Sequence, residues 1–312
     1  MIGHSPGDRS PRGQPLSGQS PADLPEAAGR RLRAAGFSSA LSIADFAACL
    51  HMGLRPVGLV QGFCAMSWYP DWYLPGTSRG GFSFSGWGKE ISSYACPHSI
   101  VHSSEHPYRG YNVEATGVEG VWSTGYNATY IRMMEEAEAL GAHGVIGVTD
   151  ATRPLLGPDV REFHLLGTAV VLDGAPPPER PWSTYLAGSK LGKLFEAGLE
   201  PVSVVGALAA VTIVPSCVTE LQEHGSFDRY GVVSPIGEII QLSDAYTAAR
   251  RLARDHVKST LGSDSLHGAD LEVSEGRVGN RAIISAVLRG TRVRRVRDAE
   301  PLPLPVPTVH IS

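Results

Sequence analysis

Two apolar segments with similar flanking residues dominate the hydrophobic pattern of the chain. They cover residues 57–66 (VGLVQGFCAM) and 202–211 (VSVVGALAAV). Both are rich in β-branched and small side chains, which favours strands that are buried on at least one face. Each follows a short helical pattern that ends at a glycine, Gly53 or Gly198, with a proline three positions later. Glycine suits the left-handed position that ends a helix, and proline prevents the helix from continuing. The pattern predicts a helix–strand unit that occurs twice.

Sequence identities support an internal duplication. Four of the five residues in 53–57 recur in 198–202, which gives an offset of 198 − 53 = 145 positions. A second matched block, Gly-Thr-x-Val, stands at 167–170 and at 290–293, with an offset of 290 − 167 = 123. The second half is therefore 145 − 123 = 22 residues shorter between these anchors. Repeats of this kind indicate one structural unit used twice.

A long helix and two further strands are predicted after each apolar strand. In the first half the helical pattern covers residues 127–142, and strands are expected at 145–150 and 162–172. The unit is thus helix, strand, long helix, strand, strand. This order predicts an α+β fold of two tandem domains, each a small antiparallel sheet with a long helix packed on it.

The second half shows the same order with weaker signals. A helical pattern runs to residue 261, with Ser243 or Asp244 as the expected N-cap. The terminal strand is expected at 282–296. Because residues 262–280 are mostly polar, the middle strand of this half is predicted to be the weaker one.

The overall composition excludes some classes of protein. Lys and Arg number 27 against 31 Asp and Glu, a net charge of −4. A nucleic-acid binder normally carries a basic surface, so we expect no nucleic-acid partner. No run approaches the roughly 18 apolar residues of a membrane span, and the N-terminal residues lack the apolar core of a signal peptide. We therefore expect a cytoplasmic protein.

Pro, Gly and Ser mark the expected boundaries. The predicted organisation is a disordered tail (1–36), a first domain (37–173) with a Trp- and His-rich insertion (67–110), a Pro-rich linker (174–182), a second, diverged domain (183–297) and a Pro-rich tail (298–312). Only a short helix near residues 24–35 is expected within the first tail.

The segments EEAEALGAHGVIGVTD (135–150) and EFHLLGTAVV (162–171) are similar to the YbjQ-like family, whose members are labelled heavy-metal-binding domains. The resemblance is strongest over 38–173 and weaker over 184–296, and it points to the actinobacterial type with two copies. It implies dodecin-like domains and ring-shaped homo-oligomers, with no established reaction or ligand. One departure is His143, which stands where relatives carry Asp or Asn.

The densest group of possible metal ligands is Cys96, His98, His102 and His106, with Glu105 beside them. Thiolate and imidazole groups suit zinc, copper or nickel, so a divalent transition metal is the one cofactor we consider. If the segment were helical, the last two histidines would share one face. The alternative is a polar surface loop with no ligand.

The other cysteines and histidines have simpler explanations. Cys49 and Cys64 lie in apolar surroundings and are expected to be buried thiols, with no disulfides in the chain. His143 follows the long helix and could cap it, and His164 precedes the GTAV block. Both are retained as possible ligand contacts. Glu136 and its acidic neighbours are expected to form a solvated helix face.

We expect no catalytic template: residues 76–80 (GTSRG) match GxSxG in letters only, within the Trp- and His-rich insertion, so no nucleophile elbow is predicted, and the sequence contains no phosphate-binding loop. The sequence therefore predicts a non-enzymatic binding or assembly module, a ring-type homo-oligomer whose apolar strands are covered by assembly. The alternatives are a metal-binding protein that uses the Cys96–His106 cluster, or an enzyme with an interface site around His143 or His164.

Overall fold

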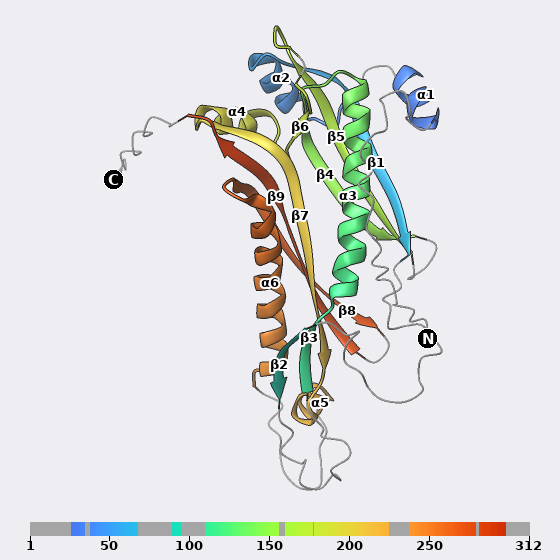
Figure 1. Cartoon of the computed structure of the whole chain (residues 1–312), viewed down its shortest axis with the longest axis vertical. Coiled ribbons are helices and arrows are strands. Elements are labelled where there is room, and N and C mark those ends of the chain that lie inside the picture. Colours follow the sequence, from blue (N-terminus) through green and yellow to red (C-terminus); the bar gives the residue numbers. More distant parts are fainter. Residues whose placement is uncertain are drawn as a thin grey trace, which may run out of the picture.

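The computed structural model describes residues 26–34, 38–67, 89–94, 110–155, 160–176, 178–224, 237–278 and 281–297. Figure 1 shows the arrangement of its helices and strands. In chain order the elements are α1 (Glu26–Ala34), α2 (Ile43–His51), β1 (Leu54–Ser67), β2 (Glu90–Tyr94), β3 (Gly110–Glu114), α3 (Thr116–Ala139), β4 (Gly144–Pro154), β5 (Val160–Leu172), β6 (Trp182–Ser183), α4 (Gly188–Glu196), β7 (Leu199–Val214), α5 (Cys217–His224), α6 (Ile240–Leu261), β8 (Ser265–Val278) and β9 (Arg281–Arg295).

The strands form two sheets. The first has the order β1-β5-β4-β6, and the second has the order β2-β3-β7-β9-β8. All pairs are antiparallel except the short parallel pair of β4 and β6. The predicted α+β class is therefore confirmed.

The two halves share one order of elements. The series α2–β1–α3–β4–β5 in the first half corresponds to α4–β7–α6–β8–β9 in the second, and the sheet neighbours β1-β5-β4 correspond to β7-β9-β8. Local irregularities recur as well. Glycines with positive φ stand in three matched pairs: Gly53 and Gly198, Gly141 and Gly262, Gly147 and Gly268. The third pair lies at a register shift in each hairpin, between residues 146 and 149 and between residues 267 and 270.

Helix α3 lies between the sheets and joins the halves into one core. It packs against β1 and β5 of the first sheet and against β7 of the second (Figure 1). Buried side chains of α3 and of both sheets form a single apolar cluster, in which Val60 is fully buried. Assembly is therefore not needed to cover the apolar strand β1. Because this core belongs to both halves, the division into two dodecin-like domains, with the predicted boundaries, stays a prediction.

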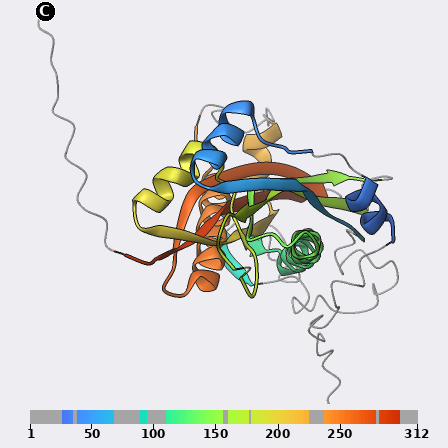
Figure 2. The same ribbon diagram turned by 90° about the horizontal axis from the view of Figure 1, so that it is seen from above.

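The other helices cover the outer faces. Helix α6 packs on the far side of β7 and β9, where Ala209, Ala249 and Ile284 are buried. Helices α2 and α4 contact each other and share a smaller cluster with the ends of both sheets. Figure 2 gives the view along α3, in which the helix is seen almost end-on beside the strands.

Three local predictions are wrong for physical reasons. Helix α3 begins at Thr116, well before residue 127, because Val118, Trp122 and Tyr126 recur at helical spacing and are buried despite the glycines among them. Helix α6 begins at Ile240, so Ser243 and Asp244 lie inside it. Strand β8 has 14 residues and pairs along β9 in spite of its polar sequence.

Glu136 is not part of a solvated face. It is 5% exposed, and its Oε2 accepts a hydrogen bond of 2.8 Å from the backbone N–H of Gln61 on the outer edge of β1. The guanidinium of Arg132 donates to the carbonyl of Phe63 on the same strand. Side chains of α3 thus satisfy backbone groups that an edge strand would leave unpaired.

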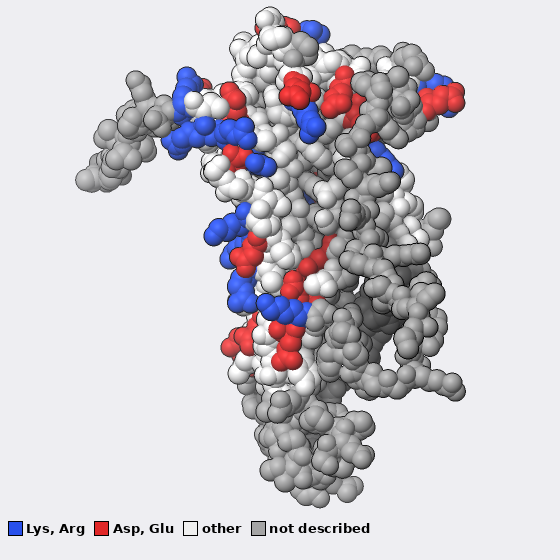
Figure 3. Space-filling model, viewed as in Figure 1, with Lys and Arg blue, Asp and Glu red and all other residues white. Residues whose placement is uncertain are grey.

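The basic end of β9 is paired within the chain. Arg292 lies 2.6 Å and Arg294 lies 3.3 Å from the carboxylate of Asp264, whose side chain is 4% exposed. Hydrogen bonds from Arg294 and Arg292 lower the pKa of Asp264. This aspartate follows Gly262 by two positions, as His143 follows Gly141, so the second half carries the carboxylate that the first half lacks. Figure 3 shows the Lys and Arg side chains at this end and along the α6 side.

Cys49 and Cys64 are buried free thiols, as predicted. Cys217 at the start of α5 is disulfide-bonded, so the expectation of a chain without disulfides is wrong.

Candidate functional site

The residues of the predicted metal cluster, Cys96, His98, His102 and His106, lie outside the described residues. Their convergence on one ion stays a prediction. The described part of the chain contains a different group of possible ligands, which is treated below.

His143 and His164 occupy separate places. The Nε2 atom of His143 is 2.9 Å from the carbonyl oxygen of Pro176, and the residue is 7% exposed. The turn before β4 is held in this way. His164 lies on β5 opposite Phe63. The backbone N–H of His143 donates to the carbonyl oxygen of Val170 on β5. Val170 lies six residues after His164 on that strand, which corresponds to roughly 20 Å. The two histidines therefore do not form one site.

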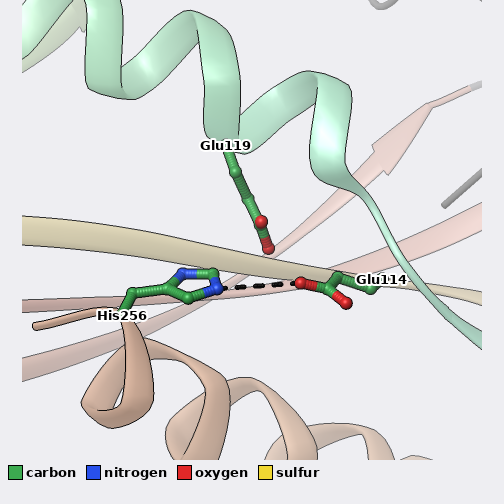
Figure 4. Close-up of side chains that lie close together, drawn as sticks. All are labelled: Glu114, Glu119 and His256. Carbon is green, nitrogen blue, oxygen red and sulfur yellow. Dashed lines mark ion pairs between the residues drawn. The ribbon is translucent and has the colours of Figure 1, made fainter. Parts of the chain in front are cut away.

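Glu114, Glu119 and His256 come together at the open edge of β7 (Figure 4). Their ligand atoms lie within 4.8 Å of one another, and Nε2 of His256 is 3.7 Å from Oε1 of Glu114. Glu119 lies in the first turn of α3, His256 lies on α6, and Glu114 is the last residue of β3. Two carboxylates and an imidazole are a possible ligand set for a divalent cation.

The same three side chains have a structural explanation. Strand β3 leaves β7 after Glu114, and Oε1 of Glu119 accepts a 3.0 Å hydrogen bond from the backbone N–H of Ala210. Burial raises the pKa of Glu119, while this backbone bond and the nearby His256 oppose the rise. The group closes the edge of β7 and ties α6 to β3.

A pocket of about 370 Å³ lies where the β4–β5 hairpin meets the β8–β9 hairpin. Its walls come from both sheets and from α3. Trp122, Leu208 and Val287 form an apolar wall, and each is at most 9% exposed. The remaining lining is polar or small: Asp150, Ala151, Thr152, Arg153, Arg161, Glu272, Ser274, Ser285 and Arg289.

Strand alternation explains why these side chains face the pocket. On β9, residues 284, 286 and 288 pack toward α6, so Ser285, Val287 and Arg289 point to the opposite face. On β8, Leu271 and Val273 pack toward α6, which directs Glu272 and Ser274 into the pocket. The β8–β9 hairpin therefore presents to the pocket the face that points away from α6.

Arg289 links the two halves across this pocket. Its Nε is 2.6 Å from Oδ2 of Asp150, and its Nη1 is 2.9 Å from Oε2 of Glu272. The side chains of Arg289 and Asp150 are only 15% and 12% exposed. Burial raises the pKa of Asp150, and the charge of Arg289 opposes that rise. Because both side chains are mostly buried, removing one of them would leave the charge of the other uncompensated.

Buried tyrosines lie behind this ion pair. The hydroxyls of Tyr126 and Tyr185 are 2.9 Å apart, and Tyr130 lies 3.1 Å from the hydroxyl of Ser183. Burial raises the pKa of Tyr185, and the charge of Asp150 adds to the rise. These hydroxyls stay protonated at neutral pH and act as fixed hydrogen-bonding groups.

None of the pocket residues was predicted as a site from the sequence. Asp150 ends the expected strand VIGVTD, and Arg289 stands within VLRGTR, one position before the matched Gly-Thr block. The repeat therefore places each of them on a hairpin. That the two hairpins face each other is a tertiary property that no local pattern reports.

The fold and the pocket define a two-sheet α+β protein built from a repeated unit, with a charged pocket between the repeats. No family model matches the chain, and no solved structure matches it. An encapsulin nanocompartment protein of Mycobacterium tuberculosis is 27% identical to it over 273 residues, which represent 85% of this chain and 88% of that protein.

This similarity corrects the family assignment made from the sequence. Nothing in the comparisons points to the YbjQ-like metal-binding family, and that assignment is wrong. The pattern that suggested it contains Gly141 and Gly147, which have φ of 64° and 59°. Gly141 lies in the turn after α3 and Gly147 lies at the register shift of β4. The pattern of glycines is therefore explained by local backbone geometry and is not evidence of common ancestry with that family. The function predicted from the sequence was a non-enzymatic binding or assembly module, with a metal-binding protein as the alternative. The same finding contradicts the metal-binding function, whereas assembly is compatible with the similarity.

Within the described residues, none of the helices has both the length and the apolar character needed to cross a membrane.

Proposed function

We propose that this chain is a structural component of a protein nanocompartment of the encapsulin kind. The observation that carries the proposal is the similarity to the encapsulin nanocompartment protein, because the aligned residues span nearly the whole of both chains. A match of that extent covers both halves and the helix between them. The role is structural rather than enzymatic, and a cytoplasmic location stays a prediction.

The surface of α2 supports contact with other copies of the chain. Ile43 is 91% exposed and Leu50 is 51% exposed, and Ala47 between them is exposed as well. These positions, i, i+4 and i+7, form one apolar stripe along the helix. Apolar stripes of this kind mark contact surfaces between proteins. Helix α2 lies at the upper end of the molecule, far from α5 (Figure 1), and we assign to it contact with a second copy.

Sedimentation tests the proposal. The full chain carries an epitope tag in the cells that naturally make it, and the lysate is separated on a sucrose gradient. We expect the chain in fast-sedimenting fractions that contain closed particles in electron micrographs. Recovery of the chain only at the top of the gradient would contradict the proposal.

A matched pair of variants tests the contact surface. Ile43→Glu with Leu50→Glu places charge on the α2 stripe and should move the chain toward the top of the gradient. Ile240→Glu changes an equally apolar residue, 63% exposed at the start of α6, and should leave sedimentation unchanged. Equal behaviour of both variants would place the contact elsewhere than on α2.

A further inference from the structure

A short segment of the second half, residues 183–188, completes the sheet of the first half. Strand β6 pairs in parallel with β4 (Figure 1), and the segment continues beside it. The backbone N–H of Thr184 donates to the carbonyl oxygen of Val145 (2.9 Å), and its own carbonyl accepts from the N–H of Val148 (3.0 Å). The outer edge of β4 is covered in this way, and Val145 is fully buried.

The repeat contains the same segment in the first half. The offset of 145 positions relates residues 38–43, here called the donor segment, to the segment beside β4. Each copy is tied to its own half by the threonine of the matched Gly-Thr block. The N–H of Tyr185 donates to Oγ1 of Thr291 (3.1 Å). The N–H of Ala40 donates to Oγ1 of Thr168, also at 3.1 Å. The donor segment is therefore held in its half as its counterpart is held in the other.

The outer edge of β8 corresponds to the covered edge of β4. Gly147 and Gly268, both with positive φ, relate the two strands by an offset of 268 − 147 = 121 positions. Ala269 thus takes the place of Val148, but it is exposed where Val148 is buried. Within the described residues, β8 pairs only with β9, and the donor segment forms no strand. An edge strand presents unpaired backbone groups to a further strand.

We propose that the donor segment of one copy pairs with the outer edge of β8 in a second copy, as its counterpart pairs with β4 inside the chain. The N–H of Ser39 then donates to the carbonyl of Leu266, and the N–H of Ala269 donates to the carbonyl of Ser39. This contact is heterologous, because a donor segment meets an acceptor edge, so it repeats from copy to copy. It rests on the proposed function, since it names the surface that α2 meets.

Helix α2 directly follows the donor segment, so the same contact brings it to α4 of the second copy. Inside the chain, Gly188 at the start of α4 packs on Asp45 of α2, where an added Cβ would lie 2.7 Å from the Cα of Asp45. At the offset of 145 positions, Gly188 corresponds to Ile43, which is 91% exposed. Gly192 corresponds to Ala47, a second member of the α2 stripe. Because Ile43 is larger than glycine, α2 stands further from its neighbour, and the stripe fills the wider gap.

Cysteines at Ala40 and Ala269 test the contact. Both alanines are exposed, and their counterparts Tyr185 and Val148 pack in one cluster, so the two positions should face the same side. Full-length Ala40→Cys and Ala269→Cys chains are produced together and treated briefly with a short bismaleimide. We expect a species of twice the 33.1-kDa chain mass on a denaturing gel only when both variants are present. The wild-type chain, treated in the same way, gives the background from the native cysteines.

A matched control uses the same strand. Glu275→Cys is also exposed on β8, six residues beyond Ala269, which corresponds to roughly 20 Å. Together with Ala40→Cys it should give no cross-linked species above the background. An equal yield with Glu275→Cys, or no species with Ala269→Cys, overturns the proposal. A species formed by Ala40→Cys alone also overturns it, because that result requires a two-fold contact.

The result is separable from that of the nanocompartment role. Closed particles that lack the cross-link would leave the role standing and overturn the head-to-tail contact. A strong cross-link in chains that stay near the top of the gradient would support the contact and contradict the role. Circular dichroism of each variant confirms that the exposed substitutions leave the chain folded.

Discussion

Replacing Gly62 by alanine tests whether α3 sits directly on β1, the contact on which the shared core depends. A Cβ atom at Gly62 would lie 1.8 Å from the carbonyl oxygen of Thr129 and 3.0 Å from the backbone nitrogen of Met133. Ordinary contacts begin at 3.4 Å. Because both neighbours are backbone atoms, no side chain can rotate away. The helix itself must retreat by about 3.4 − 1.8 = 1.6 Å.

The cost follows from that displacement. Overpacking a core typically costs about 1–3 kcal/mol, and more when backbone has to move. Removing a glycine from the unfolded chain returns about 0.5 kcal/mol. We therefore expect Gly62→Ala to lower the free energy of unfolding by about 3 kcal/mol. For a chain of 312 residues, with an unfolding entropy of about 2.1 cal/mol/K per residue, that corresponds to a fall in Tm of about 5 °C.

Thermal unfolding followed by circular dichroism measures the effect. Gly58→Ala is the matched control on the same strand, since its Cβ would meet only the Cδ1 atom of Leu140, at 3.2 Å. This flexible side chain can move, so the control should shift Tm by less than about 2 °C. If Gly62→Ala melts with the wild type, or if the control loses as much, α3 does not rest on β1 as described.

Three further substitutions test the buried charges. Burial raises the pKa of Glu119, so its contribution to stability is present below its ordinary pKa of 4.5 and is lost as pH rises through the folded value. Glu119→Gln keeps the acceptor for Ala210 and should lose less stability than wild type as the pH rises above 4.5, and parallel urea midpoints would refute this. Asp150→Ala leaves Arg289 buried with one carboxylate fewer and should cost about 2–3 kcal/mol in urea unfolding, partly recovered when Arg289→Met is added; a loss without recovery would show that the pair itself is not responsible. Hydrogen bonds from two arginines lower the pKa of Asp264, so the stabilisation by its carboxylate is present above the ordinary pKa of 3.8 and is lost as pH falls through the folded value. Asp264→Asn should therefore lower Tm at neutral pH and have the Tm of the wild type in acid. An equal fall in Tm at both pH values would contradict this dependence.

Local chemistry allowed much of the secondary structure to be predicted. The glycines at 53 and 198 and the prolines after them end one element and begin the next, and neither signal needs knowledge of the fold. The strand expected at 202–211 is therefore found within β7. The two copies also differ at one informative position. At the offset of 145 residues, Gly62 of the first half corresponds to Ala207 of the second (62 + 145 = 207). Helix α6 leaves room for a Cβ that α3 does not.

The parts that were missed depend on tertiary contacts. The first turns of α3 contain glycines and a threonine, which disfavour a helix locally, and only the burial of Trp122 between the sheets overrides that preference. From the sequence alone, Glu136 is indistinguishable from an exposed acidic residue of a helix. Only the packing of α3 against the edge of β1 shows that its carboxylate accepts a hydrogen bond from the N–H of Gln61. The pocket arises because two hairpins from different halves face each other, and no spacing within one half encodes that contact.

The mass of the native particle tests the nanocompartment role most directly. The tagged full chain is purified from its own cells under mild conditions, and single-particle mass is measured in solution. We expect particles many times heavier than the 33.1-kDa chain, with a narrow distribution, because closed assemblies have a fixed number of subunits. A population confined to 33.1 kDa or to a small multiple of it would contradict the proposed role.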